Sequence, residues 1–397
     1  MRILMVAPQP VLRSRGTPLS VYQRILCLTQ LGHEVELATY PFGDPVDIPG
    51  LVVRRSQRPW GVRDVGIGPT PAKILLDAPL FRLATKLAAS GRFDLLHTHE
   101  EAGMLGAHLS RRFGIPHVYD MHSSLPEQFA NFGRFNLPPI VAMFRAIERY
   151  TLAGSAGVIA ICDDLAALVR ERGYGGELAV IENTLQFGAP PSAGEASGNL
   201  ELRARHGLNG EPVVLYAGTL EQYQGLELLI EAAPDVRRDC TRAHFVIVGG
   251  TENQVAKLRK SVRLRQLEPC FTLVPAVSPT EVRRYYEMAN VLVTCRTRGS
   301  NTPLKIYHYL HAGKPIVATA IRSHTQVLDS DTAELVEPTP RGIAAGIVRV
   351  LRDGERAEML GAAAGRLART RYDQAVSTQR LADLLDRVGV RTSLQLQ

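Results

Sequence analysis

Residues 298–320, RGSNTPLKIYHYLHAGKPIVATA, combine a loop, a helix, a glycine turn and a buried strand. Thr302 is a good N-cap and the proline after it suits the first helical position, so the helix is expected to begin there with free backbone N–H groups. Such a helix end attracts anions, and Lys305 lies one turn inside it, with Arg296 and Arg298 just before. The spacing fits a diphosphate site and, equally well, a capped helix with solvated basic residues.

The sequence around this stretch alternates short apolar runs with amphipathic segments, the pattern of parallel sheets covered by helices on both faces. A segment rich in small residues and proline, QFGAPPSAGEASGNL, separates two such patterns and predicts a linker. The predicted fold class is α/β, with two Rossmann-like domains facing across a cleft where ligands bind beyond the carboxyl ends of the strands. The predicted parts are an N-terminal domain (1–184), a linker (185–200), a C-terminal domain (201–375), and a helix and tail (376–397) crossing back to the first domain.

Individual elements follow from the same periodicity and from the turn residues between the runs. Strands are predicted at 2–8, 34–40, 51–55, 95–98, 117–121, 157–161, 178–182, 213–217, 244–248, 271–274, 291–295 and 315–319. Helices are predicted near 18–31, 101–113, 138–153, 163–172, 225–238 and 303–312.

The composition is that of a folded enzyme-sized protein of 397 residues, with 45% hydrophobic and 21% charged residues. Five scattered cysteines favour neither a disulfide framework nor a zinc site, and they suit a reducing cytosol. No apolar run has the length of a signal peptide or a spanning helix, so a cytoplasmic location is expected. The net charge of +7 is spread over segments of mixed sign, which argues against nucleic-acid binding.

The segment from Gly313 through Pro315 into the run IVAT resembles the donor loop of family 4 glycosyltransferases, the retaining enzymes of the GT-B architecture. The resemblance covers nearly the whole chain. In that family two glutamates separated by seven residues precede this segment, and Ser300 and His308 stand at those positions here. The resemblance implies a same-face displacement, without a protein nucleophile, of a sugar from a nucleoside diphosphate.

A second match is VVLYAGTLEQYQGLELLIEA, a strand, a tight turn and a helix. Most family members carry an arginine and a lysine around this turn to neutralise the donor diphosphate, and this chain has Thr219 and Gln224 instead. The GxLExYQG and NTPLK motifs resemble those of a bacterial subset of the family. Lys305 and the helix end near Thr302 are then the expected replacements for the two cations. The remaining donor-side candidates are Gly16, Thr17, Gly218, Glu221, Gly249, Arg298, Asn301 and Pro303.

Titratable side chains gather at two strand ends in the first half of the chain. FDLLHTHEEAG places His99, Glu100 and Glu101 there, and HVYDMHSSLPEQ places Asp120 and His122. His99 matches the second histidine of the family's HxH segment, and His122 matches its cleft histidine, with a surface histidine as the alternative.

Other interpretations of these strand ends remain. Glu100 or Glu101 is equally suited to cap the next helix. A zinc site is not expected, on the view that His97 and His99 face opposite sides of the sheet. Asn183 is a partial match to the family's hinge.

The expected partners are a UDP- or GDP-linked sugar, which is a substrate rather than a cofactor, and a glycan or lipid-linked acceptor in polysaccharide synthesis. Neither a cofactor nor a metal is expected. The segment 138–153 is amphipathic, so a peripheral contact with the inner face of the plasma membrane is the alternative to packing on the sheet, which is favoured. Two rival functions are a catalytically silent sugar-nucleotide-binding subunit and a dinucleotide oxidoreductase, the latter disfavoured because G-x-G-x-x-G is absent after the first strand.

Overall fold

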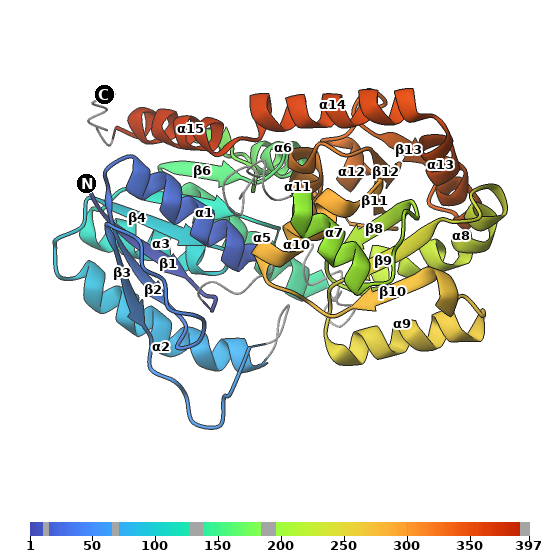
Figure 1. Cartoon of the computed structure of the whole chain (residues 1–397). Helices are drawn as coiled ribbons and strands as arrows, with labels where there is room; N and C mark the ends of the chain where they lie inside the picture. The colour runs from blue at the N-terminus through green and yellow to red at the C-terminus, as the bar shows by residue number, and fades with distance from the viewer. Residues whose placement is uncertain are drawn as a thin grey trace. The chain divides into compact units, whose positions relative to one another are not determined.

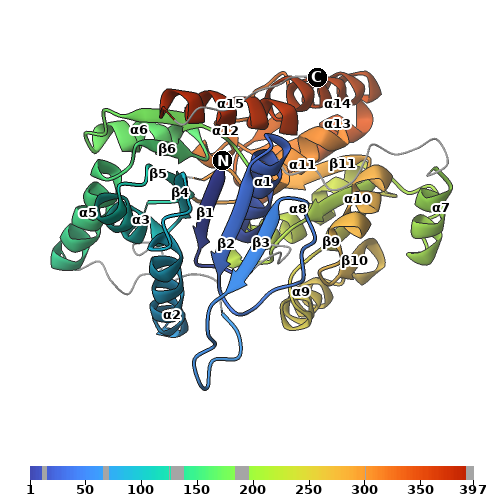
Figure 2. The same ribbon diagram turned by 90° about the vertical axis from the view of Figure 1, so that its left-hand side faces the viewer.

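The computed structural model contains two parallel β-sheets, each covered by helices on both faces (Figures 1 and 2). The structure describes residues 1–10, 16–65, 71–124, 126, 138–183, 196–299 and 301–389. These residues form two compact units. The first unit comprises the described residues of 1–183 together with 374–389, and the second comprises those of 196–373.

The first unit is built on a seven-stranded sheet with the order β3-β2-β1-β4-β5-β6-β7, in which all neighbouring strands are parallel. The order reverses between β1 and β4, which is where doubly wound sheets bind ligands at the strands' carboxyl ends. The strands are β1 (Arg2–Ala7), β2 (Glu34–Thr39), β3 (Leu51–Arg55), β4 (Leu95–His99), β5 (His117–Met121), β6 (Gly157–Ala160) and β7 (Glu177–Val180).

Helices cover both faces of the first sheet. One core cluster joins the sheet to α1 and α15, and another joins its opposite face to α2 and α3. α5 packs on α3, and α6 packs on β6 and β7. The helices are α1 (Gly16–Gln30), α2 (Pro71–Ala88), α3 (Ala102–Phe113), α5 (Pro138–Ala153), α6 (Asp163–Glu171) and α15 (Gln374–Arg387).

Helix α15 follows the whole second unit in sequence but packs on α1 and β7 of the first. Leu384 in α15 is fully buried in that core. We expect Leu384→Ala to lower the free energy of unfolding by about 3 kcal/mol, because it removes buried methyl groups and leaves a cavity. Urea denaturation measures this loss. The matched control is Leu264→Ala, at a side chain that is 74% exposed, which should change stability by less than about 0.5 kcal/mol. Equal losses in the two variants would show that α15 does not anchor the core.

The second unit repeats the doubly wound design with six parallel strands in the order β10-β9-β8-β11-β12-β13. Its order reverses between β8 and β11. The strands are β8 (Val213–Ala217), β9 (His244–Val248), β10 (Phe271–Val274), β11 (Val291–Thr294), β12 (Ile316–Thr319) and β13 (Glu334–Val336).

The helices of the second unit also cover both faces of its sheet. One cluster brings α8, α9 and α13 onto one face, and another brings α10, α11 and α14 onto the other. The helices are α7 (Ala196–Arg205), α8 (Leu226–Asp239), α9 (Glu252–Leu264), α10 (Pro279–Met288), α11 (Leu304–Ala312), α12 (Arg322–Thr325), α13 (Pro340–Arg352) and α14 (Gly354–Arg371), with 3-10 turns η1 (Gln222–Gln224) and η2 (Glu268–Cys270).

The predicted α/β class with two Rossmann-like domains is confirmed, and every predicted strand exists with ends within two residues of those expected. The sequence did not predict α2, α7, α9, α10, α12, α13, α14 or the short strand β13. Most of the predicted linker lies outside the described residues, and its last five residues belong to α7, which corrects its end. Within the described parts of the chain, no helix combines the length and apolarity needed to cross a membrane.

Candidate functional site

The donor-side residues of the second unit gather at the carboxyl ends of β8 and β9 and the start of α11. Gly218 directly follows β8, and Gly249 directly follows β9. A Cβ on Gly218 would lie 2.9 Å from Nζ of Lys305, so the ammonium lies against the turn after β8. The sequence motifs around residues 218 and 305 therefore meet in space.

Lys305 is a buried amine whose hydrogen-bond partners are neutral. Its Nζ donates to the hydroxyl of Tyr216 (2.5 Å) and to Oε1 of Gln224 (2.9 Å), and it lies 3.8 Å from the centre of the Tyr216 ring. Among the described residues, no carboxylate pairs with it. Burial is the main cause that lowers the pKa of this ammonium to about 7, and the charge of the nearby Arg296 guanidinium contributes to the shift. An amine in this setting lacks the counter-ion that buried charges normally have.

The start of α11 offers further hydrogen-bond donors next to Lys305. The helix begins at Leu304 with Pro303 at the N-cap, so the prediction that Thr302 is the N-cap was wrong by one residue. The Thr302 side chain is buried, and its hydroxyl has no hydrogen-bond partner among the described residues. An unpartnered hydroxyl, a helix N-terminus and a buried amine are together suited to hold an anion.

Two glycines let the backbone approach closely at this site. Gly218 has φ 154° and Gly249 has φ 136°, a region that favours glycine. A Cβ on Gly249 would lie 1.8 Å from the carbonyl oxygen of Gly218. The two turns therefore touch through their backbones, and neither accepts a side chain without moving.

The other donor-side candidates divide between this cluster and the surface. Gln224 links Lys305 to Thr219, because its Nε2 donates to the Thr219 hydroxyl (3.2 Å). Glu221 accepts a hydrogen bond from Gln254 (3.0 Å). Arg298 is exposed. Ser300 lies outside the described residues.

Arg296 lies in the loop before α11, and the candidate His308 lies on α11 itself. Arg296 is partly buried and donates to the carbonyl oxygens of Arg298 (2.8 Å) and Asn301 (2.7 Å). His308, on α11, stacks on Tyr286 with ring centres 6.4 Å apart, and burial lowers the pKa of its imidazole to about 4. Of these two arginines, Arg296 is the one whose charge acts on Lys305.

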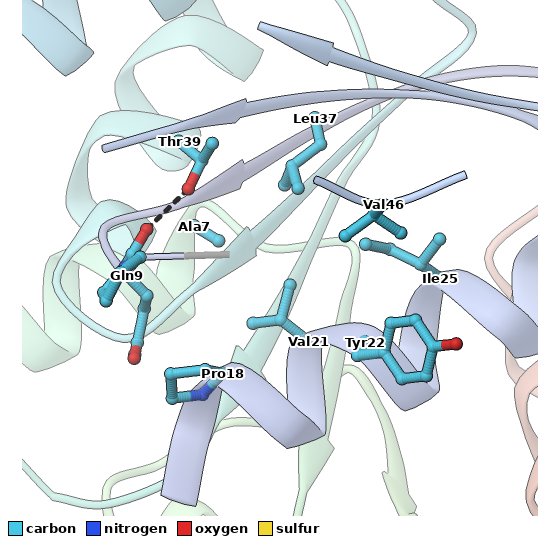
Figure 3. Close-up of a pocket in the computed structure, with 10 residues that line it drawn as sticks. Ala7, Gln9, Pro18, Val21, Tyr22, Ile25, Leu37, Thr39 and Val46 are labelled. Atoms are coloured by element: carbon cyan, nitrogen blue, oxygen red, sulfur yellow. Dashed lines mark hydrogen bonds between the residues drawn. The ribbon is translucent and has the colours of Figure 1, made fainter. Parts of the chain in front are cut away.

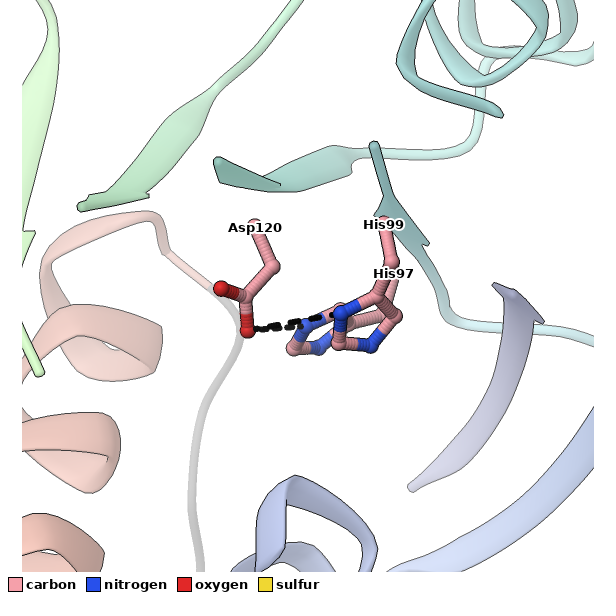
Figure 4. Close-up of side chains that lie close together, drawn as sticks. All are labelled: His97, His99 and Asp120. Carbon is pink, nitrogen blue, oxygen red and sulfur yellow. Dashed lines mark hydrogen bonds and ion pairs between the residues drawn. The ribbon is translucent and has the colours of Figure 1, made fainter. Parts of the chain in front are cut away.

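The first unit contains a buried cluster of charged and imidazole groups at the ends of β4 and β5. Asp120 is fully buried, and its Oδ2 lies 3.4 Å from Nε2 of His97 and 3.8 Å from Nδ1 of His99 (Figure 4). Its Oδ1 lies 3.4 Å from Nε2 of His122, and that nitrogen is 3.0 Å from Nδ1 of His99. Arg24 on α1 donates from Nε to Oδ2 of Asp120 at 2.7 Å. All five side chains are at most 4% exposed.

The expectation that His97 and His99 face opposite sides of the sheet is wrong. Residues two apart in a strand point to the same face, and these two rings stack with centres 4.9 Å apart. His97, His99 and Asp120 consequently offer three ligand atoms within 4.8 Å of one another. The Arg24 guanidinium occupies the same carboxylate, and its charge opposes binding of a cation there.

Glu100 lies beside this cluster in a strained backbone conformation, with φ 50°. Its carboxylate accepts hydrogen bonds from Thr17 (3.4 Å) and Ser123 (3.2 Å). Burial raises the pKa of Glu100 to about 7, and the negative charge of Glu101 adds to the shift. Glu101 occupies the N-cap position of α3, but its side chain makes no capping hydrogen bond and pairs with Lys73 instead. The capping interpretation is therefore wrong for Glu101.

Three further features of the first unit are the start of α1, Asn183 and a small crevice beside α1. Gly16 opens α1, as predicted from the single-glycine loop. Asn183 is buried, and its Oδ1 has no hydrogen-bond partner among the described residues. A narrow apolar crevice lies between α1 and the ends of β1 and β2, where Thr39 donates to the Gln9 carbonyl oxygen at 2.5 Å (Figure 3). Its volume of about 10 Å³ suits a single water rather than a sugar.

Two residues that the structure places at these sites, Arg24 and Tyr216, were not predicted from the sequence. Arg24 lies between Gln23 and the apolar run 25–28 of α1, and a lone arginine on the buried face of a helix was the signal for it. Tyr216 lies inside the apolar run of β8 and contacts Lys305 through both its ring and its hydroxyl. No motif marks it.

Two family models match the chain. The model described as "Glycosyl transferase 4-like domain" matches residues 16–184, and the model described as "Glycosyl transferases group 1" matches residues 211–353. Each match falls almost entirely within one structural unit.

Relatives with assigned activities are sugar transferases. The α-D-kanosaminyltransferase of Streptomyces kanamyceticus is 26% identical over 294 residues, which span 71% of this chain and 73% of that enzyme. The GDP-mannose-dependent α-(1-6)-phosphatidylinositol monomannoside mannosyltransferase of Mycolicibacterium smegmatis is 29% identical over 211 residues, spanning 51% of this chain and 54% of that enzyme. Such relatives favour a transferase over a silent subunit.

Solved structures share the fold over nearly the whole chain. Sucrose-phosphate synthase from Thermosynechococcus elongatus superposes with a TM-score of 0.78 at 20% identity, covering 98% of this chain and 99% of its own. HepE from Anabaena, solved with UDP-glucose, superposes with a TM-score of 0.71 at 18% identity, covering 97% and 99%. With both family models matched and the two doubly wound sheets in place, the chain belongs to the GT-B glycosyltransferases of the family 4 type.

Proposed function

We propose that this glycosyltransferase moves a sugar from a UDP- or GDP-linked donor to a glycan or lipid-linked acceptor with retention of anomeric configuration. The observation that carries the donor assignment is Lys305, a buried amine with neutral partners, next to the unpartnered Thr302 hydroxyl and the start of α11. A diphosphate supplies the counter-charge that this arrangement lacks. The solved relative HepE binds UDP and UDP-glucose, which supports a diphosphate ligand.

The proposal assigns different tasks to the two units. Lys305, the α11 N-terminus and Arg296 stabilise the departing diphosphate, whose charge increases in the transition state. His122 and His99 orient the transferred sugar and the acceptor through neutral imidazoles, and Glu100 and Asn183 lie on the acceptor side. Retention is supported by relatives named for α-linked products, which a retaining enzyme makes from an α-configured nucleotide sugar.

We propose that the reaction needs no metal ion. The group best placed to bind one, Asp120, already pairs with the Arg24 guanidinium. A cytoplasmic location is part of the same proposal, supported by five cysteines that are all free thiols. Contact with a membrane surface is a further proposal for the acceptor step, and the packing of α5 on α3 leaves its Met143 side exposed for it.

The test is a transfer assay on the purified full chain with UDP and GDP sugars, followed by NMR of the product's anomeric centre. Release of the nucleotide with an α-linked product from an α-linked donor supports the proposal. A β-linked product overturns retention. Failure of calorimetry to detect binding of any nucleotide or nucleotide sugar overturns the donor assignment.

The lowered pKa of Lys305 predicts a pH dependence of donor binding. The empty site loses its ammonium as pH rises through about 7, whereas a bound diphosphate favours the ammonium and raises its pKa. Affinity is therefore greatest below pH 7 and should fall above it by up to about tenfold per pH unit. UDP-glucose and GDP-mannose are the right probes, because their diphosphates do not titrate in this range. Calorimetry in buffers of different ionisation enthalpy should detect proton uptake of up to one per ligand at pH 8. A donor affinity that does not change between pH 6 and pH 9 would contradict this prediction.

A further inference from the structure

Arg24 is a fully buried arginine in the middle of α1. Its Nε donates to Oδ2 of Asp120 at 2.7 Å, and its Nη2 donates to the carbonyl oxygen of Ile181 at 3.4 Å. A buried guanidinium is expensive to desolvate, so a charge here needs a reason beyond packing. Its carboxylate partner, Asp120, contacts the imidazoles of His99 and His122, which the proposed function places against the transferred sugar.

The charges in this cluster balance only when the imidazoles are neutral. Arg24 contributes one positive charge and Asp120 one negative charge, so each proton added to His97, His99 or His122 leaves a net buried charge. A single proton fits between Nδ1 of His99 and Nε2 of His122 at 3.0 Å, because two N–H groups facing each other would repel. The arrangement thus selects a neutral, hydrogen-bonded imidazole pair.

The expected protonation states agree with this balance. Burial is the main cause that lowers the pKa of His99 and the pKa of His122, the latter to about 4, and the charge of Arg24 contributes to both shifts. The charge of Asp120 acts in the opposite direction on both rings. Without Arg24, the carboxylate would raise the pKa of at least one of the two imidazoles.

We propose that Arg24 is a positioning residue for sugar transfer: by pairing with Asp120 it holds the carboxylate against His99 and His122 and keeps both imidazoles uncharged. This inference rests on the proposed function, in which neutral rings meet the hydroxyl groups of sugar and acceptor. An imidazolium there would place a positive charge beside the forming oxocarbenium-like centre and would donate from both nitrogens, leaving no acceptor for a hydroxyl proton.

Other titratable groups surround the pair and enter the same equilibrium. Cys27 on α1 interacts with both Arg24 and Asp120, and burial raises the pKa of its thiol. His97 on β4 and Tyr119 on β5 interact with Asp120. Beyond β7, the ion pair of Glu182 with Arg380 follows Ile181. Because Glu182 and Arg380 balance each other, Arg24 is the charge that offsets Asp120.

The test titrates the histidine rings directly. The full chain is prepared with isotope-labelled ring nitrogens in its 11 histidines, and the rings are followed by NMR as the pH changes. The His99→Gln and His122→Gln variants identify the signals of the two rings of interest. In the wild type both rings should remain neutral down to pH 5. In Arg24→Met, the midpoint of at least one ring should rise by about one pH unit or more, since an unpaired charge within 4–6 Å shifts a pKa by one to three units. The acid limb of the kcat/KM profile should rise by the same amount.

Matched variants separate charge from packing. Arg24→Gln keeps a hydrogen-bond donor for Asp120 without the charge and should reproduce the shift if the Met variant does not fold. The Arg24→Met, Asp120→Asn double variant has no unpaired charge and should return the rings to neutrality. Arg172→Met is the control. Arg172 donates from Nε to the buried Glu148 carboxylate, with 3.0 Å between the two atoms, and neither charge is among the causes that shift the pKa of His99 or His122. This variant should leave both midpoints unchanged.

Two results would overturn the inference. The first is an Arg24→Met or Arg24→Gln protein whose His99 and His122 titrate as in the wild type. The second is a raised ring midpoint with an unchanged pH profile of transfer, which would make Arg24 a structural residue only. If the wild type transfers no sugar at all, the proposed function fails, and the ring titration still decides whether Arg24 keeps the imidazoles neutral.

Discussion

Replacing Lys305 by methionine is expected to reduce kcat/KM for sugar transfer by about 10²–10³-fold, the usual loss when one donor to a developing anion is removed. Methionine fills the same space between Tyr216 and Gln224 but carries no charge. The Tyr216 hydroxyl loses the hydrogen bond from Lys305 but still donates to the Thr219 carbonyl oxygen (2.6 Å), and Oε1 of Gln224 loses its donor. The loss should appear in kcat as well as in donor affinity, because the charge on the diphosphate grows as the sugar departs.

Folding controls make this result interpretable. Removing a buried amine that lacks a counter-ion should change the free energy of unfolding by no more than about 1 kcal/mol. Lys260→Met, at an exposed position on α9, is the matched substitution and should leave transfer at the wild-type rate. A Lys305→Met enzyme with unimpaired turnover and unchanged donor affinity would show that the diphosphate binds elsewhere.

Replacing His122 by alanine is expected to lower kcat for transfer by about 10²-fold or more, the range for a positioned group that exchanges hydrogen bonds with the reacting centre. The imidazole is 4% exposed and is held between Asp120 and His99. Its removal leaves Asp120 Oδ1 without that contact and gives the sugar no fixed partner. Affinity for free UDP or GDP should change by less than about twofold, since the proposed diphosphate contacts come from Lys305 and the start of α11.

The comparison that tests this assignment is His108→Ala, which removes an exposed histidine from α3 and should retain full activity. Stopped-flow or steady-state kinetics with saturating donor separate a loss in kcat from a loss in donor binding. Should His122→Ala transfer sugar as fast as His108→Ala, the imidazole would be a structural group and the acceptor-side assignment would fall.

Much of the fold could be predicted because buried parallel strands are nearly continuous apolar runs. The strands at Leu51–Arg55, His117–Met121 and Val213–Ala217 have the predicted bounds. Helix α2 was missed because its sequence carries an internal proline, Pro79, and little amphipathic contrast. The short strand β13 has only three residues, too few for a periodicity to show.

The site was harder to predict, because its geometry depends on contacts between residues far apart in the chain. Motif position grouped Gly218, Gln224 and Lys305 as candidates, and the structure brings the three into contact. The neutral surroundings of the lysine also depend on Tyr216, which looks like any strand residue. The pairing of Arg24 with Asp120 joins residues 96 positions apart. The wrong expectation for His97 and His99 came from a misapplied strand period, which the stacked rings correct.

The placement of α15 has a consequence for how the protein is made. A ribosome synthesises residues 1–183 first, then the whole second unit, and only afterwards the helix whose Leu381, Leu384 and Leu385 complete the first core. The earliest part of the chain to emerge is therefore the last to be finished, with an apolar face on α1 left uncovered throughout. Nascent chains stalled before residue 374 should bind chaperones through that face, while the second unit, continuous in sequence, folds on its own schedule.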